Sequence, residues 1–134
     1  MTKIIDIEGI GPAFAKKLSS AGIKSVEALL KRGATPKGRE EVAKQTGLGH
    51  KESLEWVNRA DLYRIKGVGS EYSDLLENAG VDTVVELSKR DAKNLTAKMT
   101  EANAKRKVVR RLPVEKQVAN WIAQAKKLPR AIKY

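Results

Sequence analysis

Two Gly-apolar-Gly turns, Gly9-Ile10-Gly11 and Gly67-Val68-Gly69, have the clearest potential for chemistry in this sequence. Each precedes a helical pattern, so the first amides of that helix lack an intrahelical partner and lie at the positive end of its dipole. Glycine keeps side chains away from those amides and permits the positive φ or close approach of a tight turn. Such amides suit a phosphate oxygen. Each turn is therefore a candidate site for a phosphate group, which its backbone amides would bind.

The first turn is the stronger of these two candidates. Its expected phosphate-binding residues, including two lysines that add long-range attraction, are Gly9, Ile10, Gly11, Ala13, Lys16 and Lys17. The alternative is that this stretch is only a turn that the fold requires, with the lysines on a solvated face. Glu8 beside the turn counts for that alternative.

The second turn carries the opposite charge. Its expected binding residues are Gly67, Val68, Gly69 and Ser70. The helix that follows contains Glu71, Asp74 and Glu77, and carboxylates close to a phosphate repel it. A structural or protein-facing role is therefore favoured for this turn.

A third candidate is a dense basic segment, Lys105-Arg106-Lys107-Val108-Val109-Arg110-Arg111. If it is helical, Arg106 with Arg110 and Lys107 with Arg111 lie at i,i+4, with Val108 and Leu112 turned inward. Arginine suits phosphate because its guanidinium binds two oxygens at once. The alternative is a solvated loop, or arginines that pair with carboxylates such as Glu101 and Glu115.

The elements that position these candidates come from a duplication. Residues 7–32 align without a gap on residues 65–90, and ten of the 26 positions are identical. Each copy has a turn, a helix of about ten residues, an Ala-Gly stop signal and a second short helix. Four later helices have a residue at the start that can cap them: Ser25, Thr35, Thr83 and Asp91.

The turns resemble those of the helix-hairpin-helix superfamily, and this resemblance implies binding of DNA without sequence preference through backbone amides. The whole chain is similar to a bacterial family catalogued as a domain of unknown function (4332). The stretches that carry this similarity are Ile7 to Ile23, Thr35 to Arg39, Glu55 to Leu62, Ile65 to Val81, Val109 to Pro113, and Trp121-Ile122. The spacing of the two turns departs from that in many members of the superfamily, whose two hairpins lie closer together in the sequence and bind both strands of one duplex.

Charge is segregated along the chain. Residues 1–88 contain 13 basic and 13 acidic residues, whereas residues 89–134 contain 14 and 3, which accounts for the entire net charge of +11. Such a field attracts a polyanion, and the attraction weakens as salt rises. Nucleic acid is the expected partner, with DNA favoured over RNA, although an acidic protein would feel the same field.

Several function classes are disfavoured. The sequence has no cysteine and one histidine, and it lacks a P-loop and an HExxH motif, so we expect no catalytic residue, no metal site and no cofactor. No apolar run approaches the length needed to span a membrane, so we expect no membrane partner and a cytoplasmic location. Trp56 and Trp121 have apolar helical neighbours, which favours core packing over base stacking.

The sequence predicts an all-α protein of about eight to ten short helices in two tandem SAM-like, helix-hairpin-helix units, residues 1–62 and 63–134. The leading hypothesis for function is sequence-independent nucleic-acid binding without catalysis. The rival hypothesis is a helical adaptor or scaffold that binds a protein partner and keeps the hairpins as folding turns. The oligomeric state is left open.

Overall fold

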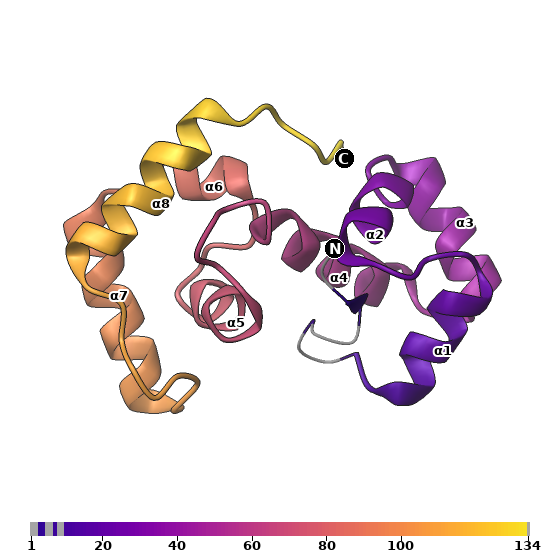
Figure 1. The fold of residues 1–134 in the computed structure, drawn as a ribbon, viewed down its shortest axis with the longest axis horizontal. Helices are drawn as coiled ribbons and strands as arrows, with labels where there is room; N and C mark the ends of the chain where they lie inside the picture. The colour runs from indigo at the N-terminus through magenta and orange to yellow at the C-terminus, as the bar shows by residue number, and fades with distance from the viewer. Residues whose placement is uncertain (1–2, 5–6, 8–9, 134) are drawn as a thin grey trace. The chain divides into compact units, whose positions relative to one another are not determined.

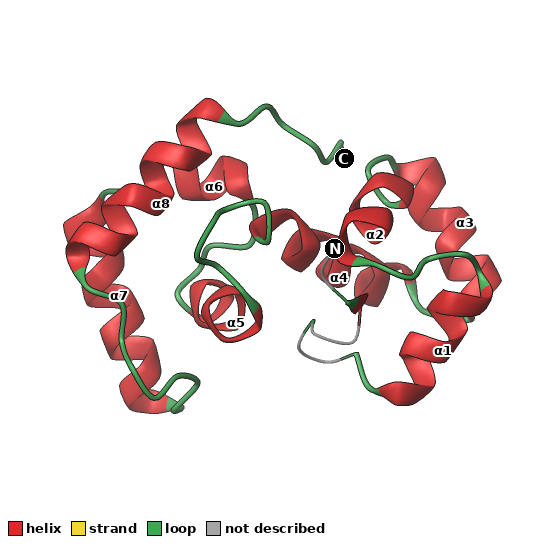
Figure 2. Cartoon of the chain, viewed as in Figure 1, coloured by secondary structure: helices red, strands yellow, loops and turns green. Residues whose placement is uncertain are grey.

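The structure, a computed structural model, describes residues 3–4, 7 and 10–133. Within these residues it contains eight α-helices and no strand, which confirms the all-α prediction (Figure 2). In chain order (Figure 1) the helices are α1 (Pro12–Ser20), α2 (Val26–Arg32), α3 (Pro36–Thr46), α4 (His50–Leu62), α5 (Ser70–Asn78), α6 (Val84–Ser88), α7 (Ala92–Lys105) and α8 (Glu115–Lys127).

The chain forms two compact units. Unit 1 comprises Met1–Asp61 together with Ala131–Tyr134, and unit 2 comprises Leu62–Arg130. The tail from Ala131 therefore groups with unit 1, whereas the division drawn from the sequence kept it with residues 63–130. In unit 1, α3 packs against α1 and α2, and in unit 2, α7 packs against α5 and α8 while α8 also packs against α6.

Side chains cap four of the helices at their N-termini, as the sequence predicts. The amides of Ala28, Gly38, Glu86 and Asn94 donate to Ser25, Thr35, Thr83 and Asp91 respectively, over 3.0 to 3.2 Å. Each bond satisfies an amide that the helix itself leaves unpaired, and such a cap typically stabilises a helix by about 1 kcal/mol. These are the starts of α2, α3, α6 and α7.

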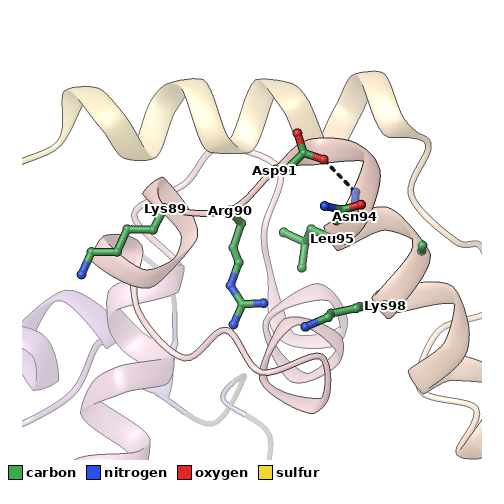
Figure 3. A pocket seen from close by; sticks show the side chains of 7 residues that line it. Lys89, Arg90, Asp91, Asn94, Leu95 and Lys98 are labelled. Atoms are coloured by element: carbon green, nitrogen blue, oxygen red, sulfur yellow. Dashed lines mark hydrogen bonds between the residues drawn. The ribbon is translucent and has the colours of Figure 1, made fainter.

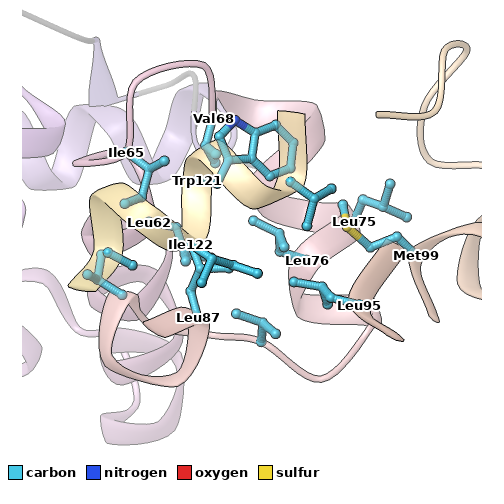
Figure 4. Close-up of a cluster of buried hydrophobic side chains, with 14 of the residues drawn as sticks. Leu62, Ile65, Val68, Leu75, Leu76, Leu87, Leu95, Met99, Trp121 and Ile122 are labelled. Carbon is cyan, nitrogen blue, oxygen red and sulfur yellow. The ribbon is translucent and has the colours of Figure 1, made fainter. Parts of the chain in front are cut away.

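The core of unit 2 is a cluster of side chains from all of its helices (Figure 4). Trp121 of α8 is 1% exposed, and Leu76 of α5 and Met99 of α7 are completely buried beside it in the same cluster. Tyr72 packs against Trp121 with 5.2 Å between the ring centroids. In unit 1, Phe14 packs edge-on against Trp56 at 5.3 Å. Both tryptophans are therefore core residues, as predicted.

The C-terminal tail is fastened inside unit 1 by a buried arginine. Arg39 of α3 donates to the carbonyls of Gly33 and Lys133, each over 2.8 Å, and the Lys133 amide donates to Ala34 over 2.7 Å. Ile132 is 1% exposed. Unit 1 is consequently built from two separate stretches of the chain.

Candidate nucleic-acid interface

The two turns are closed by matching hydrogen bonds. The Ile10 amide donates to the Ile7 carbonyl and the Val68 amide donates to the Ile65 carbonyl, both over 3.1 Å. Ile10 and Val68 are 4% and 5% exposed, so the apolar residue between the glycines anchors each turn inward. Gly9 lies outside the described residues, so its part in the first turn stays a prediction.

The helices after the turns also end alike. The Ile23 amide donates to Leu18 and the Val81 amide donates to Leu76, both over 2.8 Å, across Gly22 and Gly80 with φ of 86° and 95°. Left-handed glycines are the usual way to end a helix in this manner. These bonds lie 58 positions apart in the sequence, as do the turns themselves.

The two glycines of the second turn have different roles. Gly67 has φ of 98°, and a Cβ there would lie 3.1 Å from Nε1 of Trp121. Gly69 has φ of −116°, and a Cβ there would meet no atom within 4 Å. Gly11 of the first turn is likewise open, with φ of −85°. The turn therefore requires Gly67, whereas Gly11 and Gly69 border open space.

Helices α1 and α5 start without the side-chain caps found on α2, α3, α6 and α7. Their N-cap residues are Gly11 and Gly69, and neither helix has a side-chain cap. The first helical bonds run from Ala15 to Gly11 and from Ser73 to Gly69, each over 2.9 Å. The earlier amides of α1 from Ala13, and those of α5 from Ser70, have no partner among the described residues. They are free to donate to an anion.

The charged residues beside the two turns differ in their exposure to solvent. Lys16 and Lys17 on α1 are exposed, and Lys17 lies 5.5 Å from the Phe14 ring centroid. On α5, Glu71 is exposed, but Asp74 is only 6% exposed and contacts the Asn78 side chain. The repulsion of a phosphate by the carboxylates of α5 stays a prediction, and the structure adds that the Asp74 side chain is packed into the fold.

Two residues of α8, Gln124 and Trp121, contact the backbone of the second turn. The Lys66 amide donates to Oε1 of Gln124 over 2.8 Å, and Nε2 of Gln124 donates to the Lys66 carbonyl over 3.1 Å. With Gly67 against Trp121, both central residues of the turn contact α8. The turn is thus fixed in place before any ligand arrives, although no feature of the sequence identifies Gln124.

The basic segment is a loop. Helix α7 ends at Lys105, and Arg106 follows in an extended conformation, so the i,i+4 pairing considered for a helix does not occur. Val109 is the most buried residue of this segment, at 2% exposure, and Val108 and Leu112 are partly buried against the same core. Lys105 lies 3.6 Å from Glu101. The other four cations, Arg106, Lys107, Arg110 and Arg111, are exposed and pair with no carboxylate in the described part of the chain.

Two side chains hold this loop to the rest of unit 2. Asn103 accepts from the amides of Val108 and Val109 over 2.7 and 3.0 Å, and it donates to the Val109 carbonyl over 3.2 Å. The Tyr72 hydroxyl donates to the Arg111 carbonyl over 3.1 Å. Because Tyr72 lies in the first turn of α5, it joins the helix after the second turn to the basic loop. Neither Asn103 nor Tyr72 is among the predicted site residues. The one signal in the sequence is that Asn103 is an asparagine near the end of a helix, where its side chain can bond to the backbone.

The structure thus distributes the predicted residues over both units. The second turn and the basic loop share unit 2, where Tyr72 links them. The first turn and its two lysines belong to unit 1. Among the described residues, no group of three or more histidine, cysteine, aspartate or glutamate side chains is arranged to hold a metal ion. None of the helices that the structure describes is long and apolar enough to cross a membrane.

These observations define a class of protein. Its described residues are helical, and two of its helices follow tight turns and begin without a side-chain cap. The family described as "Domain of unknown function (DUF4332)" matches residues 8–128, and the chain belongs to this family. No curated protein and no solved structure matches the chain.

Proposed function

We propose that the chain binds nucleic acid, with DNA favoured over RNA, without sequence preference and without catalysis, and that its units are tandem helix-hairpin-helix units. The observation that carries this proposal is the contrast between helix starts. Four helices receive a side-chain cap, whereas α1 and α5, which follow the Gly-apolar-Gly turns, do not. Helix α8, which starts after Val114, also lacks a side-chain cap, but α1 and α5 have a glycine at the N-cap that leaves the helix start open. Free amides at the positive end of a helix suit a phosphate oxygen.

The basic loop supplies the charge that the turns lack. Its four cations without a carboxylate partner lie on a backbone that Asn103 and Tyr72 fasten at several points. A fastened loop loses less conformational entropy on binding than a mobile one. Because Tyr72 connects α5 to this loop, a duplex phosphate at the second turn would have arginines close by, which offsets the charge of Glu71.

Binding through backbone amides and flexible cations supports the proposal that the chain has no sequence preference. Both kinds of donor reach phosphate oxygens, which are the same at every base pair, whereas sequence is recognised at base edges in the grooves. The two tryptophans are buried and therefore provide no stacking platform for bases. We accordingly expect contacts with the phosphate backbone rather than with bases.

The test compares two labelled duplexes of unrelated sequence, measured by fluorescence anisotropy against the full chain. The first variant replaces Arg106, Lys107, Arg110 and Arg111 with glutamine. The matched control makes the same change to glutamine at four other exposed cations of unit 2, Lys116, Lys126, Lys127 and Arg130. We expect equal affinity for both duplexes and a much larger loss in the loop variant than in the control. Equal losses in the two variants, or affinities that differ tenfold between the duplexes, would refute the assigned interface.

The second candidate function is a helical adaptor that binds a protein. The observation that favours it is the presence of opposite charges on one unit. Glu71 is exposed in the first turn of α5, and the next residue, Tyr72, contacts the basic loop. A stoichiometric protein recovered from nuclease-treated lysate, together with no duplex binding at low salt, would support the adaptor. Recovery only while nucleic acid is intact would exclude it.

A further inference from the structure

A hollow of about 510 Å³ opens in unit 2 beside the start of α7 (Figure 3). Its volume lies within the usual range for sites that bind small molecules, roughly 300 to 1,000 Å³. It is lined by Lys89, Arg90, Asp91, Asn94, Leu95, Ala97 and Lys98. The lining contains three cations and one carboxylate, and it shares no residue with the turns or the basic loop.

Arg90 is held rigidly at this hollow. Its Nε and Nη2 donate to Oε1 of Glu86 over 3.1 and 3.0 Å, and Nη2 also donates to the Gly80 carbonyl over 3.0 Å. Nη1 has no partner among the described residues. The guanidinium is therefore fixed along one edge, while the remaining nitrogen is available to another acceptor.

Lys98 of α7 points toward Arg90 across the hollow (Figure 3). Its ammonium group forms no ion pair within the part of the chain that the structure describes. The Asp91 carboxylate also lines the hollow, but it accepts from the Asn94 amide over 3.0 Å, and the Lys89 side chain points away from Arg90 (Figure 3). Glu86 balances part of the charge of Arg90, but no carboxylate balances Lys98.

The equivalent arginine of unit 1 has a neutral acceptor on the helix that follows it. Arg32, 58 positions before Arg90, donates to the Ala21 carbonyl over 3.1 Å and to Oε1 of Gln45 over 2.9 Å. In unit 1 the following helix, α3, thus supplies an acceptor to the arginine. In unit 2 the following helix, α7, presents a cation to it. Two facing cations repel unless an anion lies between them.

We propose that this hollow binds a phosphate group, held by Nη1 of Arg90 and by the ammonium group of Lys98. Arginine and lysine are both phosphate binders, the first through planar geometry and the second as a mobile point charge. The phosphate comes either from a nucleic-acid backbone or from a small phosphate compound. The proposal stands on the hollow itself and does not depend on the proposed function.

The test is an NMR titration of the ¹⁵N-labelled full chain with inorganic pyrophosphate, compared with sodium chloride at equal ionic strength. We expect saturable shifts of the amides of residues 89–98 with pyrophosphate only. The Lys98→Gln variant should bind about tenfold more weakly, because it loses a charge-assisted hydrogen bond. The matched control is Lys93→Gln, which removes an exposed lysine of the same helix that does not line the hollow, and it should bind like the wild type.

A mixed-sequence duplex, added in a parallel titration, identifies the source of the phosphate. Shifts of the same amides that disappear in Lys98→Gln point to the nucleic-acid backbone, and pyrophosphate shifts without duplex shifts point to a small compound. The proposal is overturned if pyrophosphate and chloride act alike, or if the two variants bind pyrophosphate equally.

Discussion

At the scale of single residues, the two glycines of the second turn serve different purposes. Gly67 is required by the conformation of the turn, whereas Gly69 leaves open space in which a ligand could lie. Gly67 has a positive φ and lies against Trp121, whereas Gly69 has an extended conformation and faces open space. The spacing of the glycines in the sequence indicates a tight turn but does not say which position is left-handed. That difference depends on packing against α8, which lies more than 40 residues further along the chain.

The first prediction concerns the stability of this turn. Gly67→Ala places a Cβ in the left-handed region and next to Trp121, and we expect a loss of about 2 kcal/mol in the free energy of unfolding. Gly69→Ala should cost about 1 kcal/mol or less, because only N-cap preference opposes it. Urea denaturation measures both values. Equal losses would contradict the different roles of the two glycines.

Asn103 provides the second prediction at this scale. Asn103→Ala removes three hydrogen bonds to the backbone of the basic loop, so the amides of Val108 and Val109 should exchange with solvent much faster. Helix content should stay the same, and duplex affinity should fall. The matched control is Asn94→Ala, at an exposed asparagine of the same helix. Unchanged exchange at Val108 and Val109 would show that Asn103 does not hold the loop.

At the scale of the elements, helix starts were the most predictable feature. Ser25, Thr35, Thr83 and Asp91 are short polar residues directly before apolar patterns, and all four cap their helices. The end of α7 was not predictable in the same way. Four of residues 106–111 are arginine or lysine, which form helices well, and two are valine, which does not. The side chain of Asn103 accepts from the amides of Val108 and Val109, and the chain leaves the helix after Lys105.

The third prediction tests the free amides of α1. Gly11 already has the extended backbone of an N-cap, and a Cβ there meets no atom, so Gly11→Asp should cap α1 and leave stability unchanged or slightly higher. The carboxylate then occupies the amides and repels phosphate, so duplex affinity should fall about tenfold or more.

Its control is Lys24→Gln, which changes the net charge by the same amount at an exposed residue beyond the other end of α1. Thermal unfolding gives the stability, and anisotropy gives the affinity. If the two variants weaken binding equally, the effect is general electrostatics and the amides of α1 bind no phosphate.

At the scale of the whole molecule, the all-helical class and the repeated turns follow from periodicity and from the duplication. The path of the tail does not. Ile132 and Lys133 join unit 1 because Arg39 is buried there and binds the Lys133 carbonyl, a contact between residues 94 positions apart. Contacts between residues so far apart in the chain leave no local pattern in the sequence. For the same reason, Gln124 and Tyr72 are not among the predicted site residues.

Charge segregation is the other property of the whole chain, since residues 89–134 carry the full net charge of +11. The basic loop and the proposed phosphate site at Arg90 and Lys98 both belong to that stretch. A chain that uses this charge on nucleic acid must release counterions when it binds. Salt dependence therefore tests the central claim more directly than affinity alone.

The decisive measurement is duplex affinity over a series of salt concentrations, for the wild type and for the variant with glutamine at Arg106, Lys107, Arg110 and Arg111. We expect the logarithm of the association constant to fall linearly with the logarithm of salt concentration. The slope of the variant should be smaller by roughly 0.9 for each phosphate contact removed, or about 3 to 4 in total. Identical slopes, or no binding at low salt, would contradict phosphate binding by this loop.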